Sequence, residues 1–101
     1  MSLVAVFEYE VEPAGAQAFE AVYGSDGEWA RFFAAGDGYL GTELLRAAGG
    51  ETLHYLVIDR WRSASAYQAF LDAHAEEYAS RNETAKRLWK TERALGRFEA
   101  G

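Results

Sequence analysis

The chain has 101 residues, half of them hydrophobic and 15% aromatic, a composition that excludes a disordered protein. Its formal net charge is -6 with scattered acids, which argues against nucleic acid and anionic membranes as partners, because a phosphate backbone needs clustered Lys and Arg. There is no cysteine for disulfide or thiolate chemistry, no secretory signal pattern and no bilayer-spanning apolar run. We expect one cytoplasmic domain over residues 1–101.

The chain opens with a predicted strand over Leu3–Glu12, whose alternate residues are apolar and which Pro13 and Gly15 bring to an end. A helix follows, with apolar residues at helical spacing: Ala16, Phe19, Val22 and Tyr23. After the turn at residues 24–27, Ser25 and Glu28 have the spacing of a capping box. They predict a second helical piece, stopped by residues 36–38, with these residues inward: Trp29, Phe32 and Phe33.

The middle of the chain predicts a hairpin of Tyr39–Arg46 and Leu53–Trp61, joined by a connector over residues 47–52 that contains two glycines. From Ser63 the chain predicts a helix with this apolar stripe: Tyr67, Phe70, Leu71, His74 and Tyr78. Asn82 is expected to cap one more short helix that carries Leu88 and Trp89. Arg93–Glu99 suits a final strand.

The order strand, helix, strand, strand, helix, strand is that of the ferredoxin-like α+β fold, an antiparallel four-stranded sheet with helices on one face. The stretches "LVAVF" and "YLVI" are apolar at every position, which is typical of strands buried on both sides. One chain of this length has nothing left to cover the second face. We therefore expect a homodimer in which two sheets pack about a two-fold axis.

Three stretches carry a resemblance to a known family: "GYLGTELLR", "LVIDRWRSASAYQAF" and "TERALGRFE". In order and spacing they resemble the antibiotic biosynthesis monooxygenase domains, which belong to the dimeric α+β barrel group. The second stretch looks like that family's junction of a strand, a Trp-x-Ser pair and a helical Tyr or Phe. The resemblance covers nearly the whole chain and implies the same fold and pairing.

One branch of the family consists of cofactor-independent monooxygenases that oxidise phenols or anthrones with dioxygen, in a cavity between sheet and helices. Resemblance to this branch implies active-site roles for Trp61, Tyr67 and Arg81, with no cofactor. Two further positions depart from the branch. Its strand asparagine falls on Val57 and its histidine falls on Leu45.

Such a reaction needs an apolar aromatic pocket, a proton acceptor and a cation or donor that stabilises the phenolate. The candidate walls are Trp29, Phe33, Trp61, Tyr67 and Phe70. Arg81 or Arg60 would supply the charge, and His54 or His74 would be the base, because histidine titrates near neutrality.

A structural interpretation of the same residues stays open. The aromatic residues are equally compatible with plain core, with Trp61 as a plug at its end. His74 would then be a packed residue, and Asp59-Arg60 a cross-strand or inter-subunit ion pair.

The remaining classes of site lack support in the sequence. A second branch of the family degrades haem, but the first strand lacks its asparagine, Phe70 stands at its tryptophan position, and His74 is only loosely placed as iron ligand. Two histidines twenty positions apart form no metal site, and no glycine-rich phosphate loop is present. The alternative to an oxygenase is a non-catalytic ligand-binding or stress-associated barrel. An open pocket of ligand size, reached by Trp61, Tyr67 and either Arg81 or a histidine, would favour the enzyme. A collapsed, dry cluster of the same aromatic residues would favour the alternative.

Overall fold

The protein is described by a computed structural model that covers residues 1–47 and 49–101. Its sheet and its helical segments have these bounds, in chain order: β1 (Ser2–Val11), η1 (Pro13–Gly15), α1 (Ala16–Tyr23), α2 (Glu28–Phe33), β2 (Tyr39–Arg46), β3 (Leu53–Trp61), α3 (Ala64–Ala73), α4 (Ala75–Ala85), η2 (Lys86–Leu88) and β4 (Thr91–Ala100).

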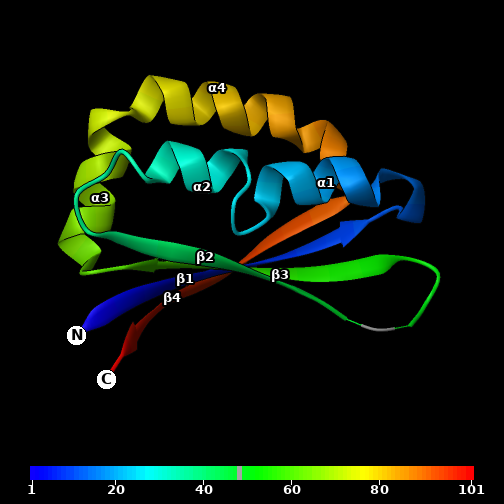
Figure 1. The fold of residues 1–101 in the computed structure, drawn as a ribbon, viewed down its shortest axis with the longest axis horizontal. Coiled ribbons are helices and arrows are strands. Elements are labelled where there is room, and N and C mark those ends of the chain that lie inside the picture. The colour runs from blue at the N-terminus through cyan, green and yellow to red at the C-terminus, as the bar shows by residue number, and fades with distance from the viewer. Residues whose placement is uncertain (48) are drawn as a thin grey trace.

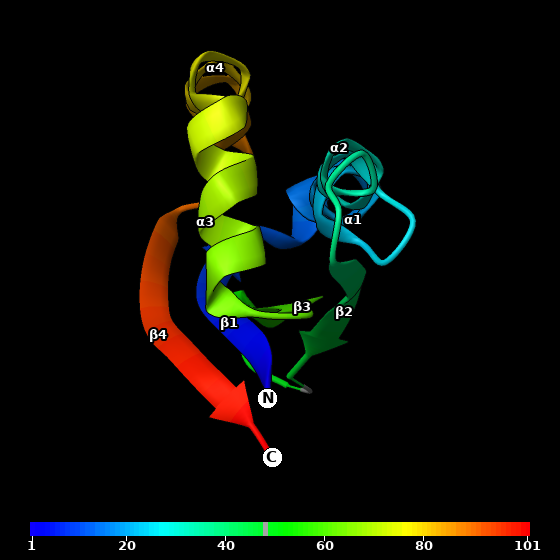
Figure 2. The same ribbon diagram turned by 90° about the vertical axis from the view of Figure 1, so that its left-hand side faces the viewer.

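The four strands form one antiparallel sheet in the order β2-β3-β1-β4, and all the helices cover the same face of it (Figure 1). Seen from the end in Figure 2, α1 and α2 lie on the side of β2 and β3, and α3 and α4 on the side of β1 and β4. In both views α4 is the element farthest from the sheet. The predicted ferredoxin-like α+β fold is confirmed.

Strand alternation decides which residues reach the helices. In β1 the odd positions from Leu3 to Val11 share the helical face with the odd positions of β3, since Leu3 pairs with Trp61 and Tyr9 with Tyr55. These residues form the core together with the inward faces of α1, α2 and α3. The even positions of β1 and β3 point to the other face, and they include Val4, Val6, Leu56 and Ile58. Leu45 of β2 pairs with Leu56, and Phe98 of β4 pairs with Val4, so both lie on this face as well.

The predicted capping box at Ser25 and Glu28 is wrong. Gly27 is the residue that precedes α2, and it makes no side-chain capping bond. A β-carbon on Gly27 would lie 2.7 Å from the carbonyl oxygen of Val22, so close packing of two backbone segments selects this residue. The inward placement of Trp29, Phe32 and Phe33 is nevertheless as predicted, because all three are buried.

The apolar stripe that begins after Ser63 crosses two helices. The backbone of His74 leaves helical geometry, with φ -121° and ψ 30°, and this separates α3 from α4. The hydrogen bonds from His74 N to Phe70 O (3.0 Å) and from Tyr78 N to His74 O (2.8 Å) continue across the break. The stripe therefore keeps a helical period although the helix axis changes direction.

Other boundaries differ by a few residues. Asn82 lies within α4 and caps nothing, and the short helix predicted after it is the single turn η2. The last strand begins two residues earlier than predicted, and the predicted connector over residues 47–52 contains residue 48, which lies outside the described residues. None of the helices in residues 1–47 and 49–101 is long and apolar enough to cross a membrane.

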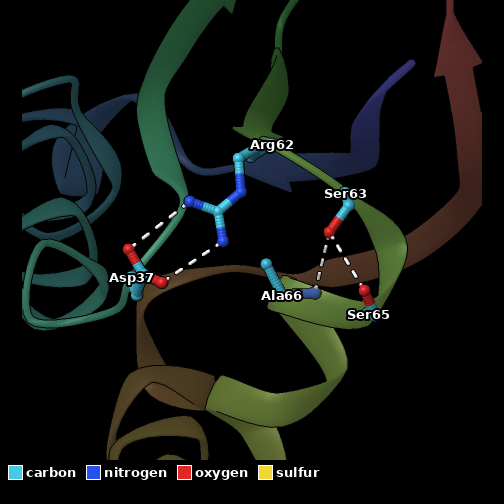
Figure 3. Close-up of polar contacts among 5 residues, drawn as sticks. All are labelled: Asp37, Arg62, Ser63, Ser65 and Ala66. Carbon is cyan, nitrogen blue, oxygen red and sulfur yellow. Dashed lines mark hydrogen bonds and ion pairs between the residues drawn. The ribbon is translucent and has the colours of Figure 1, made fainter.

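The junction from β3 into α3 is held by local polar contacts (Figure 3). The Ser63 hydroxyl accepts a hydrogen bond from the backbone N–H of Ala66 at 3.1 Å and lies 3.1 Å from the hydroxyl of Ser65. Arg62 reaches across to Asp37 at 3.2 Å and ties the start of this junction to the loop before β2. The cap fixes where α3 begins, and hence where Tyr67 and Phe70 point.

We expect Ser63→Ala to lower the free energy of unfolding by about 1 kcal/mol, because it removes the only side-chain acceptor for the first turn of α3 among the described contacts. Urea denaturation measures the change. Ser65→Ala is the matched control, since the one described hydrogen bond of the Ser65 side chain is to Ser63 and alanine favours helix. Equal losses for the two variants would contradict a capping role for Ser63.

Candidate functional site

The site is built on the helical face of β3. Its alternate residues Tyr55, Val57, Asp59 and Trp61 are all buried there, three of them apolar or aromatic and one a carboxylate. β3 is a central strand of the sheet, paired with β1 and β2 along its length. Its backbone is thus hydrogen-bonded to a neighbouring strand on both sides, which fixes the positions of its buried side chains.

Trp61 is the hub of the aromatic cluster and has no exposed surface. Its ring lies 5.4 Å from those of Tyr67 and Phe70 and 5.7 Å from that of Phe33, measured between centroids. Gly36 packs directly against the Trp61 ring, and only a residue without a side chain fits there, because a β-carbon would come within 2.9 Å of the ring. The Trp61 indole N–H has no hydrogen-bond partner among the described residues.

Next to this cluster, between the sheet and the helices, lies a cavity with an open volume of about 30 Å³, which has room for about two water molecules. Its walls come from every layer of the fold. The lining residues are Phe7, Tyr9, Tyr23, Trp29, Phe33, Val57, Asp59, Tyr67, Tyr78, Asn82 and Glu92. The walls thus combine aromatic rings with the polar groups of tyrosine, carboxylate and amide side chains.

Asp59 is the one charged residue among the fully buried side chains described, with 4% of its surface exposed. The Thr42 hydroxyl on β2 donates to its Oδ1 at 2.6 Å, and Thr42 in turn contacts the hydroxyl of Tyr39. Burial raises the pKa of Asp59 from 3.8 to about 6, and the Thr42 bond offsets only part of this effect. Asp59 therefore changes charge close to neutral pH.

The tyrosines of the cavity behave differently. Burial raises the pKa of Tyr9, Tyr23, Tyr67 and Tyr78, and nearby acids or phenols add to the effect. The Tyr9 hydroxyl donates to Glu92 at 2.6 Å and the Tyr23 hydroxyl accepts from the Trp89 indole at 3.1 Å. These phenols stay protonated. The single O–H of Tyr9 is taken up by Glu92, whereas the hydroxyls of Tyr67 and Tyr78 donate no hydrogen bond among the described contacts and can donate to a ligand.

The structure brings together some of the predicted site residues. Trp29, Phe33 and Tyr67 line the cavity. Trp61 and Phe70 contact Tyr67 or each other but stand behind the cavity wall. Three of the predicted residues thus share the lining of one cavity, contributed by α2 and α3.

The predicted charged and basic residues lie elsewhere. Arg81 pairs with Glu77 at 2.8 Å and stacks over the ring of Phe32 on α2, and it is not among the residues that line the cavity. His74 packs against the ring of Phe70 with 4.4 Å between centroids, at the α3–α4 junction. His54 is exposed and sits at an even position of β3, on the other face of the sheet.

Arg60 also points to the other face, where it pairs with Glu43 on β2 at 3.1 Å. The ion pair expected at Asp59-Arg60 is therefore wrong for Asp59, because successive strand residues face opposite ways. In residues 1–47 and 49–101 no group of three or more His, Asp or Glu side chains is arranged to hold a metal ion.

Sequence reasoning missed Asp59 and Tyr78 as cavity residues. The signal for Asp59 was present, since its position has the same parity as Tyr55, Val57 and Trp61, which the strand pattern buries. Tyr78 was placed on the apolar stripe, but its approach to the cavity depends on the break at His74.

A second hollow of about 170 Å³ lies between α1–α2 and α4, on the outer side of the helical layer. Trp29 forms part of its wall and part of the inner cavity wall as well. The Trp29 side chain, only 8% exposed, thus separates the cavity from this outer groove.

We expect Asp59→Asn to raise the free energy of unfolding near pH 8 by on the order of 2–3 kcal/mol, because the folded state then no longer holds a buried charge. An aspartate with a raised folded pKa stabilises the fold below its unfolded pKa and loses that contribution as pH rises to about 6. The difference between variant and wild type should therefore vanish near pH 4. Urea denaturation at both pH values measures it.

The exposed Asp37 provides the control, and Asp37→Asn should change stability by less than about 0.5 kcal/mol at either pH. An Asp59→Asn variant that is less stable than wild type at both pH values would contradict a buried charge that opposes folding.

Two solved proteins illustrate what this chain is similar to. SnoaB, a cofactor-independent oxygenase from Streptomyces nogalater, superposes with a TM-score of 0.70 at 25% identity, over 99% of this chain and 93% of that chain. A point variant of SnoaB gives 0.70 at 28% identity, over 98% and 92%. The haem degrader MhuD from Mycobacterium tuberculosis, solved with two haems in its active site, gives 0.52 at 27% identity, over 96% and 94%.

No curated protein sequence matches the chain. The family described as antibiotic biosynthesis monooxygenase matches residues 2–83, which include β1, β2, β3, the core helices and all but one of the cavity residues. The predicted resemblance is confirmed: this chain belongs to the antibiotic biosynthesis monooxygenase family.

Proposed function

We propose that the protein is a cofactor-independent monooxygenase that oxidises a small phenolic or anthrone-type aromatic with dioxygen. The observation that carries the proposal is the cavity, which combines the aromatic walls of Trp29 and Phe33 with phenol donors and a buried carboxylate. Similarity to SnoaB, a cofactor-independent oxygenase, supports the reaction class.

The chemistry suits such a cavity. Loss of the phenolic proton makes an electron-rich anion that gives one electron to dioxygen, and the resulting radical and superoxide combine at a ring carbon. Loss of the hydrogen on that carbon and cleavage of the O–O bond leave a carbonyl group and release water. Aromatic walls exclude bulk water, while neutral tyrosine hydroxyls such as Tyr67 donate hydrogen bonds to the developing oxyanion.

Access requires side-chain movement, because the cavity of about 30 Å³ is smaller than the roughly 150 Å³ cavity that accepts benzene in another protein. Trp29 is the side chain that would move, since the outer groove of about 170 Å³ lies directly behind it. The substrate would enter between α1–α2 and α4.

A second candidate function follows from the same volume. A collapsed cavity favours a non-catalytic ligand-binding or stress-associated protein, in which the aromatic cluster is a core that a ligand only occasionally opens. Such a protein would bind phenols without consuming dioxygen. Haem degradation receives less support, because His74 packs on Phe70 away from the cavity.

The chain is also proposed to act as a homodimer. The face of the sheet without helices carries the apolar side chains of Val4, Val6, Leu45, Leu56, Ile58 and Phe98. Phe98 is 52% exposed and Leu45 44% exposed. A second copy of the sheet would cover them symmetrically.

We expect the purified protein to accelerate oxygen uptake with 1,8-dihydroxyanthrone above its spontaneous oxidation, as measured with an oxygen electrode. Tyr67→Phe should lower kcat by at least about tenfold, because it removes a donor to the oxyanion while it keeps the ring. Tyr55→Phe is the matched control, since Tyr55 is equally buried on β3 but bonds to Glu20 outside the cavity. Binding of the anthrone without uptake would favour the second candidate.

The mass in solution should be twice 11.2 kDa at micromolar concentration, as measured by light scattering. Phe98→Glu should shift it to the monomer, because it places a charge in the apolar face without touching the core. Ala21→Glu adds the same charge on the exposed side of α1 and should leave the mass unchanged. A monomeric wild type would rule out the pairing.

A further inference from the structure

We propose that Asp59 is the proton acceptor of the reaction and that it restricts the substrate to uncharged phenols of the hydroquinone or anthrone type. This inference rests on the proposed function and deepens it. It assigns the proton acceptor to a residue of the sheet in place of either histidine, and it names the charge state of the ligand.

The placement of Asp59 is that of a group facing a ligand. It lines the cavity from a central strand, and its one described hydrogen bond, from Thr42, occupies Oδ1. Directly opposite on β1 stands Ala5, which has no polar side-chain atom to compete for the carboxylate. A carboxylate has about four acceptor positions, so most of its capacity remains for a donor in the cavity.

Two carboxylates line the cavity among the described residues, and Asp59 is the buried one, since Glu92 on β4 is exposed and accepts the Tyr9 hydroxyl. Tyr39 and Thr42 face it from β2, Tyr67 from α3 and Tyr78 from α4, and the tyrosines hold their protons because burial raises their pKa. Arg97 on β4 lies over the Tyr67 ring, 4.8 Å from its centroid, and is not among the residues that line the cavity. With a pKa raised to about 6, Asp59 is both ionised at pH 7 and a stronger base than a surface aspartate.

Charge also limits the ligand. The described residues that line the cavity include two acids, Asp59 and Glu92, and no Lys, Arg or His. A substrate that carries its own carboxylate would be repelled at short range where water does not screen the charges. A neutral phenol instead donates its O–H to Asp59.

Asp59 carries each proton that moves in the proposed reaction. It takes the phenolic proton, returns it to the peroxide oxygen after dioxygen has added, and then takes the hydrogen on the oxygenated carbon as the O–O bond breaks. That last proton combines with the departing hydroxide as water. Asp59 ends each cycle ionised, and dioxygen is the sole oxidant.

The test compares wild type with Asp59→Asn in oxygen uptake with 1,8-dihydroxyanthrone across pH. In wild type kcat/KM should rise with pH through about 6 as Asp59 loses its proton. Asp59→Asn should lose that rise and lower kcat by about a hundredfold or more near neutral pH. Glu43→Gln removes a carboxylate on the other face of the sheet and is the matched control. It should keep the rise of kcat/KM with pH and the wild-type kcat. A variant Asp59→Asn with the wild-type profile would overturn the proposal.

A binding measurement keeps the inference separate from the oxygenase proposal. Tryptophan fluorescence should report that wild type binds hydroquinone at least tenfold more tightly than 2,5-dihydroxybenzoate. Asp59→Asn should reduce this ratio of the two dissociation constants. If wild type consumes no dioxygen but shows this preference, the oxygenase proposal fails while Asp59 remains the recognition group. Equal binding of the two phenols by wild type, or no binding of either, would overturn the proposal for Asp59.

Discussion

The structure depends on one constraint: only every second side chain of β3 can face the helices. β3 is a central strand, so these side chains are enclosed by the two neighbouring strands and by the helices above them. That alternation places Trp61 in the centre of the aromatic cluster and Asp59 two residues before it at the cavity. The helices bury this cluster, and the cap at Ser63 fixes where α3 begins and so where its aromatic side chains lie. Gly36 has no side chain and leaves room for the rings of Trp61 and Phe70. A polar residue on this face cannot reach solvent, so its chemistry is set by the fold.

The elements were predictable because their signals are local. Strand alternation, the glycines of the connector and the apolar stripe all act within a few residues, and β2 and β3 have the predicted bounds. The capping box failed because the cap at α2 is decided by contact between backbone segments at Gly27, which side-chain spacing does not reveal.

The site was half predictable. Trp29, Phe33 and Tyr67 followed from helical spacing and from the family resemblance. The position of His54 on the face without helices could be predicted, because His54 directly precedes the buried Tyr55 and successive strand residues face opposite ways. The position of Arg81 outside the cavity lining could not be predicted, since it depends on the change of helix axis at His74. Val57 stands at the asparagine position implied by the resemblance and lines the cavity as an apolar residue. Asp59, on the same face two residues further, is the polar side chain with which β3 lines the cavity.

The protonated tyrosines have a consequence for the survival of the protein. A phenol that keeps its proton gives up an electron far less readily than a phenolate does. In an oxygenase of the proposed kind, superoxide and a substrate radical would form within contact of Tyr67 and Tyr78, whose own rings resemble the substrate. Burial holds their pKa above the usual range. In the proposed reaction it would therefore make the substrate phenolate the easier electron donor and protect the tyrosines of the wall from oxidation.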